Sequence, residues 1–492
     1  MLCDRRRPLA ALAALIALGA CKGDDGASAG DATTAASADT GATEASATAG
    51  TDTADTADTA DTADAAPTWY QDIAPITAAK CSGCHLAGGI APFALTTYEE
   101  AAPWAPFLAD SVEAGTMPPF LADDTPECQP RHGWKDDLRV GDAERALLRA
   151  WADAGAPAGD PAAAAPLPEP PRLDLPDADL RLTIPSPITI DGAKDRYLCF
   201  SIDPGFDTDA WIDALQINAG NPKIVHHVLL YVDESGASAD LASDGPYPCF
   251  GGPGVDASGL IGVWAPGMAT SYTPPDTAFR VPAGARLVMS VHYHPTGAPE
   301  LDDATSVDLR FHPSLPTYLA LLALIGNEGS AAGGLLPGPG DRGKVEFRVP
   351  AGAAGHTETM AIQLGGIPDL RVWAAGTHMH YVGTDMVAGI QRGAPQPGEP
   401  ATECLVQTPR WDFGWQRAYA YDAPLDQVPV VRAGDTMLLR CTYDNTLQNP
   451  FVAGALAERG LDAPIDVYLG EETLDEMCLG VFGVAIKIAD LL

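Results

Sequence analysis

Residues 285–294 read ARLVMSVHYH, and residues 223–232 read KIVHHVLLYV. Both stretches are rich in β-branched, aromatic and aliphatic residues and lie between Gly, Pro, Asn or Asp, which is typical of β-strands. Similar runs occur at 344–349, 370–375 and 436–443. Because helix-length segments do not alternate with these runs, the pattern favours antiparallel sandwiches over βαβ units. The region after residue 176 is too long for one ordinary sandwich, so we expect two all-β sandwich domains, at 176–313 and 314–492.

The histidines of this region are clustered. The chain has ten histidines, and six of them lie in three groups: His226 with His227, His292 with His294, and His378 with His380. Residues i and i+2 of a strand point to the same face, so a His-x-His pair offers two imidazoles to one metal ion. Adjacent residues point to opposite faces, so His226 and His227 can share a metal only where the strand is distorted or ends. A lone strand histidine more often belongs to the core or the surface, but this clustering predicts metal sites, and imidazole suits zinc, copper and iron.

Upstream of the β region, residues 81–85 read Cys-Ser-Gly-Cys-His. In this spacing the thiols of Cys81 and Cys84 attach haem c covalently, and His85 is placed as an axial iron ligand. A redox dithiol or half of a zinc site would use the same cysteine pair. However, no thioredoxin-like βαβ pattern surrounds it, and only Cys128 lies nearby as a further zinc ligand.

A sixth iron ligand should follow within the same domain. Met117, on the loop Gly-Thr-Met-Pro-Pro, is the predicted ligand, although a methionine packed in a small core is the other interpretation. His132 is the second candidate ligand. A helix that starts at Asp142 would close the domain. We therefore predict a small all-α, cytochrome c-like haem domain at 67–158, followed by a Pro- and Ala-rich linker at 159–175.

The N-terminus resembles a bacterial lipoprotein signal. Residues 5–7 are arginines, residues 8–18 are apolar, and the run ends Leu-Gly-Ala-Cys at Cys21. The apolar run is too short to span a membrane. We expect 1–21 to be a lipoprotein signal peptide and the protein to be exported and anchored by a lipid on Cys21, on the periplasmic or cell-surface side. An ordinary signal peptide with an incidental cysteine is the alternative. Residues 22–66 predict a disordered acidic tether.

The charge balance excludes two classes of partner. The chain has 492 residues, of which 66 are acidic and 29 are Lys or Arg, and its formal net charge is −37. Binding to nucleic acid, or to a membrane surface through a polybasic patch, requires clustered Lys and Arg. We therefore expect no nucleic-acid partner.

Four motifs carry a resemblance to a known family: Val225-His226-His227, Val291-His292-Tyr293-His294, Thr377-His378-Met379-His380 and Asp475-Glu476-Met477-Cys478. On these motifs, 176–492 resembles the copper type II, ascorbate-dependent monooxygenases, which include peptidylglycine α-hydroxylating monooxygenase and dopamine β-monooxygenase. The resemblance implies two jelly-roll sandwiches that each hold one copper ion and face each other across a solvent-filled cleft. The implied ligands are His226, His227 and His292 for the first copper, and His378, His380 and Met477 for the second. The resemblance places His294 beside the first site without binding the metal.

The resemblance also bears on the remaining cysteines. It implies a disulfide between Cys441 and Cys478 and favours a second between Cys199 and Cys249. Cys128 and Cys404 are left over, and their pairing is open. The run from Trp411 to Gln416 resembles bacterial, cytochrome-fused members of the family.

The activity that the resemblance implies is hydroxylation of an aliphatic C–H bond of a small organic substrate by O2. Gly376 stands where the peptide-amidating enzyme has an arginine for its substrate carboxylate, and Leu479 and Val481 replace an asparagine and a tyrosine. A peptidylglycine substrate is therefore not expected. The fused haem c predicts that electrons from a donor, either a reductant or a redox protein, pass to the first copper.

Two other classes of function stay open. One is a haem and copper electron-transfer or copper-binding lipoprotein without oxygenase activity. The other is a structural surface protein whose histidines hold a single zinc ion, which the Cys-x-x-Cys-His motif disfavours.

Overall fold

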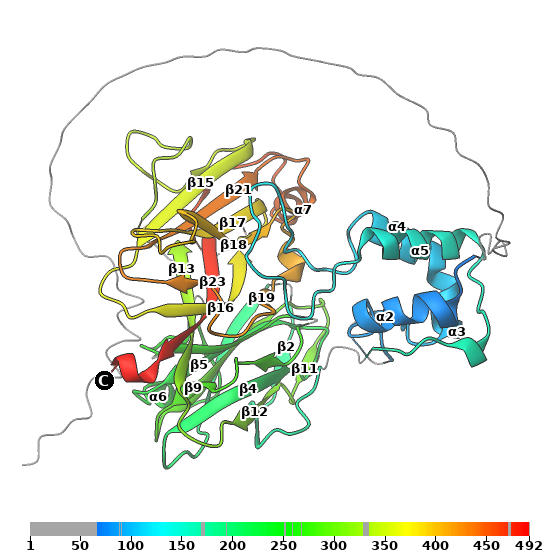
Figure 1. Cartoon of the computed structure of the whole chain (residues 1–492). Coiled ribbons are helices and arrows are strands. Elements are labelled where there is room, and N and C mark those ends of the chain that lie inside the picture. The colour runs from blue at the N-terminus through cyan, green and yellow to red at the C-terminus, as the bar shows by residue number, and fades with distance from the viewer. Residues whose placement is uncertain are drawn as a thin grey trace, which may run out of the picture.

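The computed structural model describes residues 66–491, except 88, 90, 169–172, 193, 250–251, 258, 267, 328–333 and 471–473. The predicted signal peptide, lipidation site and acidic tether lie outside the described residues. No helix among the described residues is long and apolar enough to cross a membrane. The described chain is mostly β-sheet, with a small group of helices beside the sheets (Figure 1).

The helices form a unit around their own apolar core. Its elements are η1 (Trp69–Ile73), α2 (Ala74–Lys80), α3 (Tyr98–Ala101), η2 (Ala102–Trp104), α4 (Ala105–Glu113) and α5 (Asp142–Asp153), and η3 (Pro161–Ala163) follows them. Trp69 and Trp151 are buried in this core with ring centroids 5.9 Å apart. The α5 helix begins at Asp142 as predicted, because the Glu144 carboxylate accepts a 2.8 Å hydrogen bond from the N–H of Gly141.

The segment between α4 and α5 leaves the helical unit and runs along the β-sheets (Figure 1). We call residues 117–139 the strap. Phe120, Ala122 and Trp134 of the strap belong to the core of the C-terminal β unit. The predicted haem domain at 67–158 is therefore not one packing unit, because its middle section buries apolar side chains against the sheets instead of against the helices.

The N-terminal β unit contains twelve described strands. They are β1 (Leu180–Thr183), β2 (Ile188–Ile190), β3 (Arg196–Ile202), β4 (Ala210–Asn218), β5 (Val225–Asp233), β6 (Tyr247–Pro248), β7 (Gly259–Trp264), β8 (Ser271–Tyr272), β9 (Thr277–Val281), β10 (Arg286–Tyr293), β11 (Glu300–Asp302) and β12 (Ser306–Phe311), with a short helix α6 (Ser238–Leu241). The order β7-β5-β10-β3-β6 on one side and β1-β12-β4-β9 on the other is antiparallel throughout. Strands β5 and β10 are those that the sequence predicts from residues 223–232 and 285–294.

The C-terminal β unit has two packed sheets. Its strands are β13 (Tyr318–Asn327), β14 (Arg348–Val349), β15 (Ala354–Gln363), β16 (Leu370–His378), β17 (Gly383–Gln391), β18 (Thr402–Thr408), β19 (Ala418–Ala420), β20 (Val430–Val431), β21 (Thr436–Asp444), β22 (Val467–Tyr468) and β23 (Cys478–Lys487), with η4 (Phe413–Trp415), α7 (Pro450–Glu458) and η5 (Ile488–Leu491). The sheet β15-β21-β17-β18 packs through Met386 and Leu439 against Val372 and Phe482 of the neighbouring sheet.

One predicted strand needs correction, and one feature of the sheets was not predicted. The strand predicted at 344–349 is wrong for most of its length: only Arg348–Val349 is strand, because the Asp341 carboxylate accepts the N–H of Glu346 and ties the preceding residues into a turn. The two β units share a sheet, a feature on which the sequence made no prediction. Strand β13 pairs with β23 along its whole length and continues to β7 and, in parallel, to β9, so one sheet passes through both units.

Candidate functional site

The first histidine cluster forms at a strand distortion. Along the β5–β10 ladder His292 pairs with His227, but Tyr293 pairs with Val225, so His226 is an extra residue in a β-bulge. The bulge turns His226 toward the side of its neighbour: the Nδ1 atoms of His226 and His227 are 3.3 Å apart, and those of His292 and His227 are also 3.3 Å apart. The condition that the sequence set for adjacent histidines to share a metal is therefore met.

The distances in this cluster fit a metal ion. Candidate ligand atoms of His226, His227 and His292 all lie within 4.8 Å of one another. Imidazole nitrogens bind a metal at about 2.0–2.1 Å, which places two tetrahedral ligands about 3.3 Å apart. Burial lowers the pKa of His226 to about 4, helped by the neighbouring His292, and it lowers the pKa of His227 far below its usual value. Both rings are therefore neutral, the form that binds metals.

Asp195 orients the cluster, although no sequence motif pointed to this residue. Its Oδ2 accepts a hydrogen bond from Nε2 of His292 at 3.0 Å, and its Oδ1 accepts one from Nδ1 of His294 at 2.7 Å. Burial alone would raise the pKa of Asp195, but these hydrogen bonds lower it below its usual value. With Nε2 of His292 protonated, the lone pair lies on Nδ1, which faces His227. As predicted, His294 lies beside the cluster, through its shared partner Asp195.

The second group of predicted ligands is also placed together. The rings of His378, at the end of β16, and His380 are 5.2 Å apart. Gln416 Oε1 accepts from Nδ1 of His378 at 2.6 Å, and the Asp475 carbonyl accepts from Nδ1 of His380 at 3.1 Å, so each ring carries its lone pair on Nε2. Burial lowers the pKa of His378.

Met477, the third predicted ligand, precedes β23 and is held by two hydrogen bonds. Its N–H donates to Oε1 of Glu476 at 2.8 Å, and its carbonyl accepts from the Tyr443 hydroxyl at 2.9 Å. Glu476 is fully buried and also accepts the N–H of His380, so one carboxyl group links the two backbone segments that carry the ligands. Neither Glu476 nor Tyr443 was singled out by its residue type.

Both groups line one cavity of about 420 Å³. Phe413 lies between them: its ring stacks on His226 at a centroid distance of 5.7 Å and meets the edge of His380 at 6.1 Å. The centroids of His226 and His380 are therefore at most 11.8 Å apart, the sum of these distances. The cavity is otherwise mainly apolar, with walls formed by Leu229, Val263, Trp264, Leu322, Trp373, Leu479 and Val481.

The predicted haem ligands lie on the helical unit. Cys81 and Cys84 are not in disulfides, whereas all six other described cysteines are. The Phe93 carbonyl accepts from Nδ1 of His85 at 3.0 Å, which leaves the lone pair on Nε2 for iron. Burial raises the pKa of Cys84, and the positive charge of Arg417, a residue of the cavity wall, opposes this rise. Cys84 therefore lies within electrostatic reach of Arg417.

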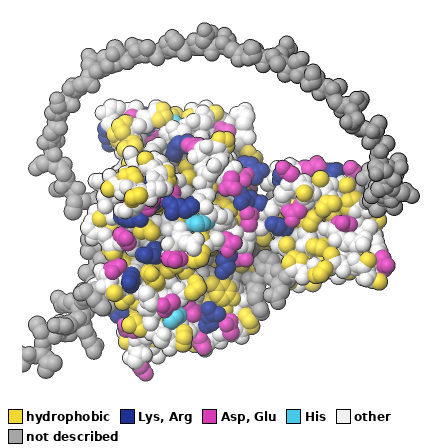
Figure 2. All heavy atoms as spheres, in the orientation of Figure 1, with side chains coloured by type: hydrophobic (Ala, Val, Ile, Leu, Met, Phe, Trp, Pro, Cys, Tyr) yellow, Lys and Arg dark blue, Asp and Glu magenta, His cyan; other side chains and the backbone are white. Residues whose placement is uncertain are grey.

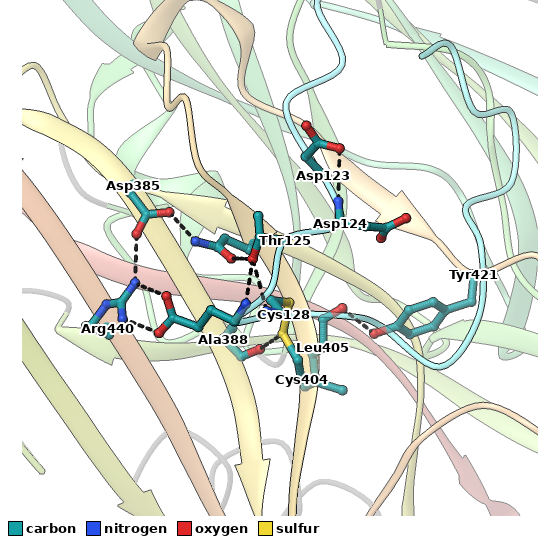
Figure 3. Close-up of a disulfide and its surroundings, with 12 residues drawn as sticks. Asp123, Asp124, Thr125, Cys128, Asp385, Ala388, Cys404, Leu405, Tyr421 and Arg440 are labelled. Atoms are coloured by element: carbon teal, nitrogen blue, oxygen red, sulfur yellow. Dashed lines mark hydrogen bonds and ion pairs between the residues drawn. A yellow bond between two sulfur atoms is a disulfide. The ribbon is translucent and has the colours of Figure 1, made fainter. Parts of the chain in front are cut away.

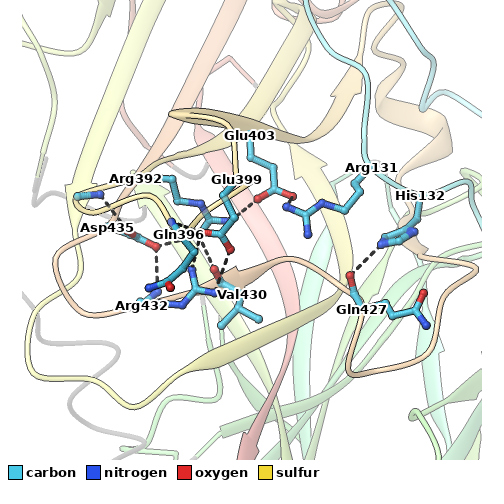
Figure 4. A network of polar contacts seen from close by, with 11 residues as sticks. Arg131, His132, Arg392, Gln396, Glu399, Glu403, Gln427, Val430, Arg432 and Asp435 are labelled. Carbon is cyan, nitrogen blue, oxygen red and sulfur yellow. Dashed lines mark hydrogen bonds and ion pairs between the residues drawn. The ribbon is translucent and has the colours of Figure 1, made fainter.

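An apolar wall beside His85 also fits haem. The Phe93 ring lies 4.7 Å from His85 and stacks at 4.2 Å on Trp104, whose neighbour on the helix is Phe107. Trp104 and Phe107 are both exposed, and Phe107 is the most exposed large apolar side chain among the described residues. Met117 is half-buried on the loop after α4, and no described contact joins it to His85. His132 lies on the strap, where its Nε2 donates to the Gln427 carbonyl at 2.8 Å (Figure 4).

The cysteine pairing is complete for the described β region and strap. Cys441–Cys478 and Cys199–Cys249 are disulfides, which confirms both pairs that the resemblance favoured. The pair left open, Cys128 and Cys404, is a third disulfide that joins the strap to β18 (Figure 3).

Comparisons with known proteins add little to this geometry. No family model matches the chain, and no curated protein matches it. Among solved structures, the major capsid protein P2 from bacteriophage PM2 is similar over 62% of this chain and 97% of that chain, with 10% identity and a TM-score of 0.25. A likeness this low supports no argument about the function of either β unit.

Proposed function

We propose that the chain is a copper-dependent monooxygenase that hydroxylates an aliphatic C–H bond of a small organic substrate with O2. In this proposal both β units are jelly-rolls of the copper type II family and the helical unit is cytochrome c-like. The observation that carries the proposal is the convergence of two ligand sets, His226 with His227 and His292, and His378 with His380 and Met477, on a single cavity. Three imidazoles suit copper, and a thioether stabilises Cu(I) in particular.

When bound, copper would supply the reaction with O2, in which two electrons and two protons are consumed and water is released, and haem c would supply one-electron transfer. The side chains position these groups. Asp195 and Gln416 fix the rings of His292 and His378 by hydrogen bonds. The walls between the ligand sets are mainly apolar, and no acid–base side chain needs to be assigned.

The proposal assigns haem c to Cys81, Cys84 and His85. Because His132 is bound to the β body through Gln427, Met117 is the better supported sixth ligand. The protein would be an exported lipoprotein anchored at Cys21, and three disulfides are consistent with a compartment in which such bonds persist.

Metal analysis of full-length protein matured with haem c tests the proposal. We expect about one iron and about two copper ions per chain, and loss of about one copper in His378→Ala and in Met477→Ala. His312→Ala is the matched control, since His312 lies outside both ligand sets and contacts the Ser314 carbonyl. O2 uptake is then screened against small apolar compounds. Zinc instead of copper would refute the proposal, and full copper loading without substrate-dependent O2 uptake would leave an electron-transfer or copper-binding protein.

A further inference from the structure

The cavity is completed by the strap and not by the β units alone. Phe120, Lys135 and Asp136 line it together with the two ligand sets. The strap is held against the sheet at this point: the N–H of Lys135 donates to the Ala420 carbonyl at 2.8 Å, and Trp134 stacks on Tyr421 with centroids 5.1 Å apart. A segment that the sequence assigns to the haem domain therefore supplies part of the wall that a substrate would touch.

The backbone at this position adopts an uncommon conformation. Asp136 has a φ of 53°, in the left-handed region that few non-glycine residues adopt. Such conformations persist where the surrounding structure holds them and are concentrated at ligand-binding sites. The disulfide Cys128–Cys404 and the ion pair of 2.7 Å between Arg131 and Glu403 hold the preceding strap residues (Figures 3 and 4).

The charges on the cavity wall are concentrated at the end closed by the strap. Four charged side chains line the cavity: Lys135, Asp136, Asp195 and Arg417. Asp195 is engaged by two histidines, and the other three lie on the strap or directly before β19. The Lys135 ammonium lies 5.8 Å from the ring centroid of Tyr272, another wall residue, and forms no ion pair with a residue that the structure describes. The Lys135 ammonium is therefore available to an anionic ligand at this end, with the Arg417 guanidinium on the same wall.

We infer that the cavity binds an apolar molecule that ends in a carboxylate, with the apolar part between the ligand sets and the carboxylate beside Lys135 and Arg417. Among the described residues that line the cavity, Lys135 and Arg417 are the Lys and Arg side chains, and both belong to this end. A cavity of about 420 Å³ is in the range of small-molecule sites. The inference rests on the proposed function in taking this cavity as the substrate site.

Calorimetric titration of the full-length, metal-loaded protein under nitrogen tests the inference with three probes of equal chain length: decanoate, decanol and decylamine. We expect decanoate to bind most tightly. Lys135→Ala should weaken decanoate binding about 3- to 10-fold, as for a partly exposed charge contact, and leave decanol binding unchanged. Lys135→Glu should weaken decanoate further, and the exposed Lys487→Ala is the matched control.

Three results would overturn the inference. The first is that none of the probes binds. The second is that both Lys135 variants bind decanoate as tightly as wild type does, and the third is a preference for decylamine that Asp136→Asn removes. The proposed function fails separately. If decanoate binds in a Lys135-dependent way without stimulating O2 uptake, the oxygenase activity is refuted and the binding site stands. If decanol and decanoate stimulate O2 uptake equally in wild type and Lys135→Ala, the carboxylate preference alone is refuted.

Discussion

The disulfide between the strap and β18 should control whether the strap stays docked. Cys128 and Cys404 are 276 residues apart, and for a loop of that length the chain-entropy model gives a stabilisation of about 5.6 kcal/mol at 25 °C. The same relation gives about 4.1 kcal/mol for Cys199–Cys249, which are 50 residues apart. We therefore predict that the double variant Cys128→Ser, Cys404→Ser loses more unfolding free energy than the double variant Cys199→Ser, Cys249→Ser.

The contacts that would remain are weaker and partly exposed. Arg440 pairs with Glu127 of the strap at the surface, and Arg131 pairs with Glu403, and such ion pairs contribute about 0–1 kcal/mol each (Figures 3 and 4). Burial of Trp134 contributes about 1.5–3 kcal/mol. Without the disulfide the strap should therefore open locally while the sheets stay folded, because the sheets keep their own cores.

Limited trypsin digestion of the folded protein measures this opening, since the strap offers Arg131, Lys135 and Arg139 as cleavage sites. We expect strap cleavage to be at least about tenfold faster in the Cys128/Cys404 variant, which corresponds to about 1.4 kcal/mol of opening free energy. The Cys199/Cys249 variant is the control. It should unfold at a lower denaturant concentration than wild type, but its strap should be cleaved no faster than that of wild type. Equal strap cleavage in both variants would refute the reasoning and show that Trp134 and the ion pairs suffice.

Three further predictions concern polar side chains beside the ligand sets and in the core. Asp195→Asn should weaken copper binding at the first site about 10- to 100-fold, because His292 loses the carboxylate that fixes its tautomer; competition with a Cu(I) chelator measures this, and an unchanged affinity would contradict the role. Burial, despite hydrogen bonds from backbone N–H groups, raises the pKa of Glu476 to about 8, so the folded apo-protein holds a proton that the unfolded chain releases near its ordinary pKa. The unfolding free energy of the apo-protein should therefore fall as the pH rises from about 5 to 8. In Glu476→Gln, urea titrations should show a smaller dependence of the unfolding free energy on pH. An equally steep dependence in this variant would refute the role of Glu476. Arg392 is fully buried between Glu403 and Asp435 (Figure 4), so Arg392→Met should cost about 3–5 kcal/mol by removing the cation that lies between two buried carboxylates. A loss below about 1 kcal/mol in the same titrations would contradict this role.

The parts of the molecule that the sequence predicted are those whose cause is local. Strands β5, β10, β16 and β21 follow from runs of β-branched and aliphatic residues, and α5 follows from a start signal at Asp142. The strand at 344–349 failed because a side chain, the Asp341 carboxylate, binds the backbone there and competes with the ladder. On the face that Figure 2 shows, Lys and Arg side chains lie among acidic side chains.

The parts that could not be predicted depend on residues far apart in the chain. Asp195 lies 97 residues before His292, and Gln416 lies 38 residues after His378, so no spacing rule relates either of them to its histidine. The strap shows the same limit for domains. Its residues carry no strand or helix signal, and only the folded chain reveals that Cys128 finds Cys404 across 276 residues.

The His226–His227 pair shows where local and long-range information meet. Because successive side chains of a regular strand point to opposite faces, two adjacent histidines would not reach the same metal ion. From the sequence, His226 and His227 can share a metal ion only if the strand is distorted at this point, and the sequence does not show whether it is. The pairing partner decides it: β10 offers Tyr293 to Val225 and His292 to His227, which leaves His226 with no position in the ladder. The bulge that turns three Nδ1 atoms toward one point is thus a property of the β5–β10 register, and shifting that register by one residue would move His292 to the opposite face and dismantle the site.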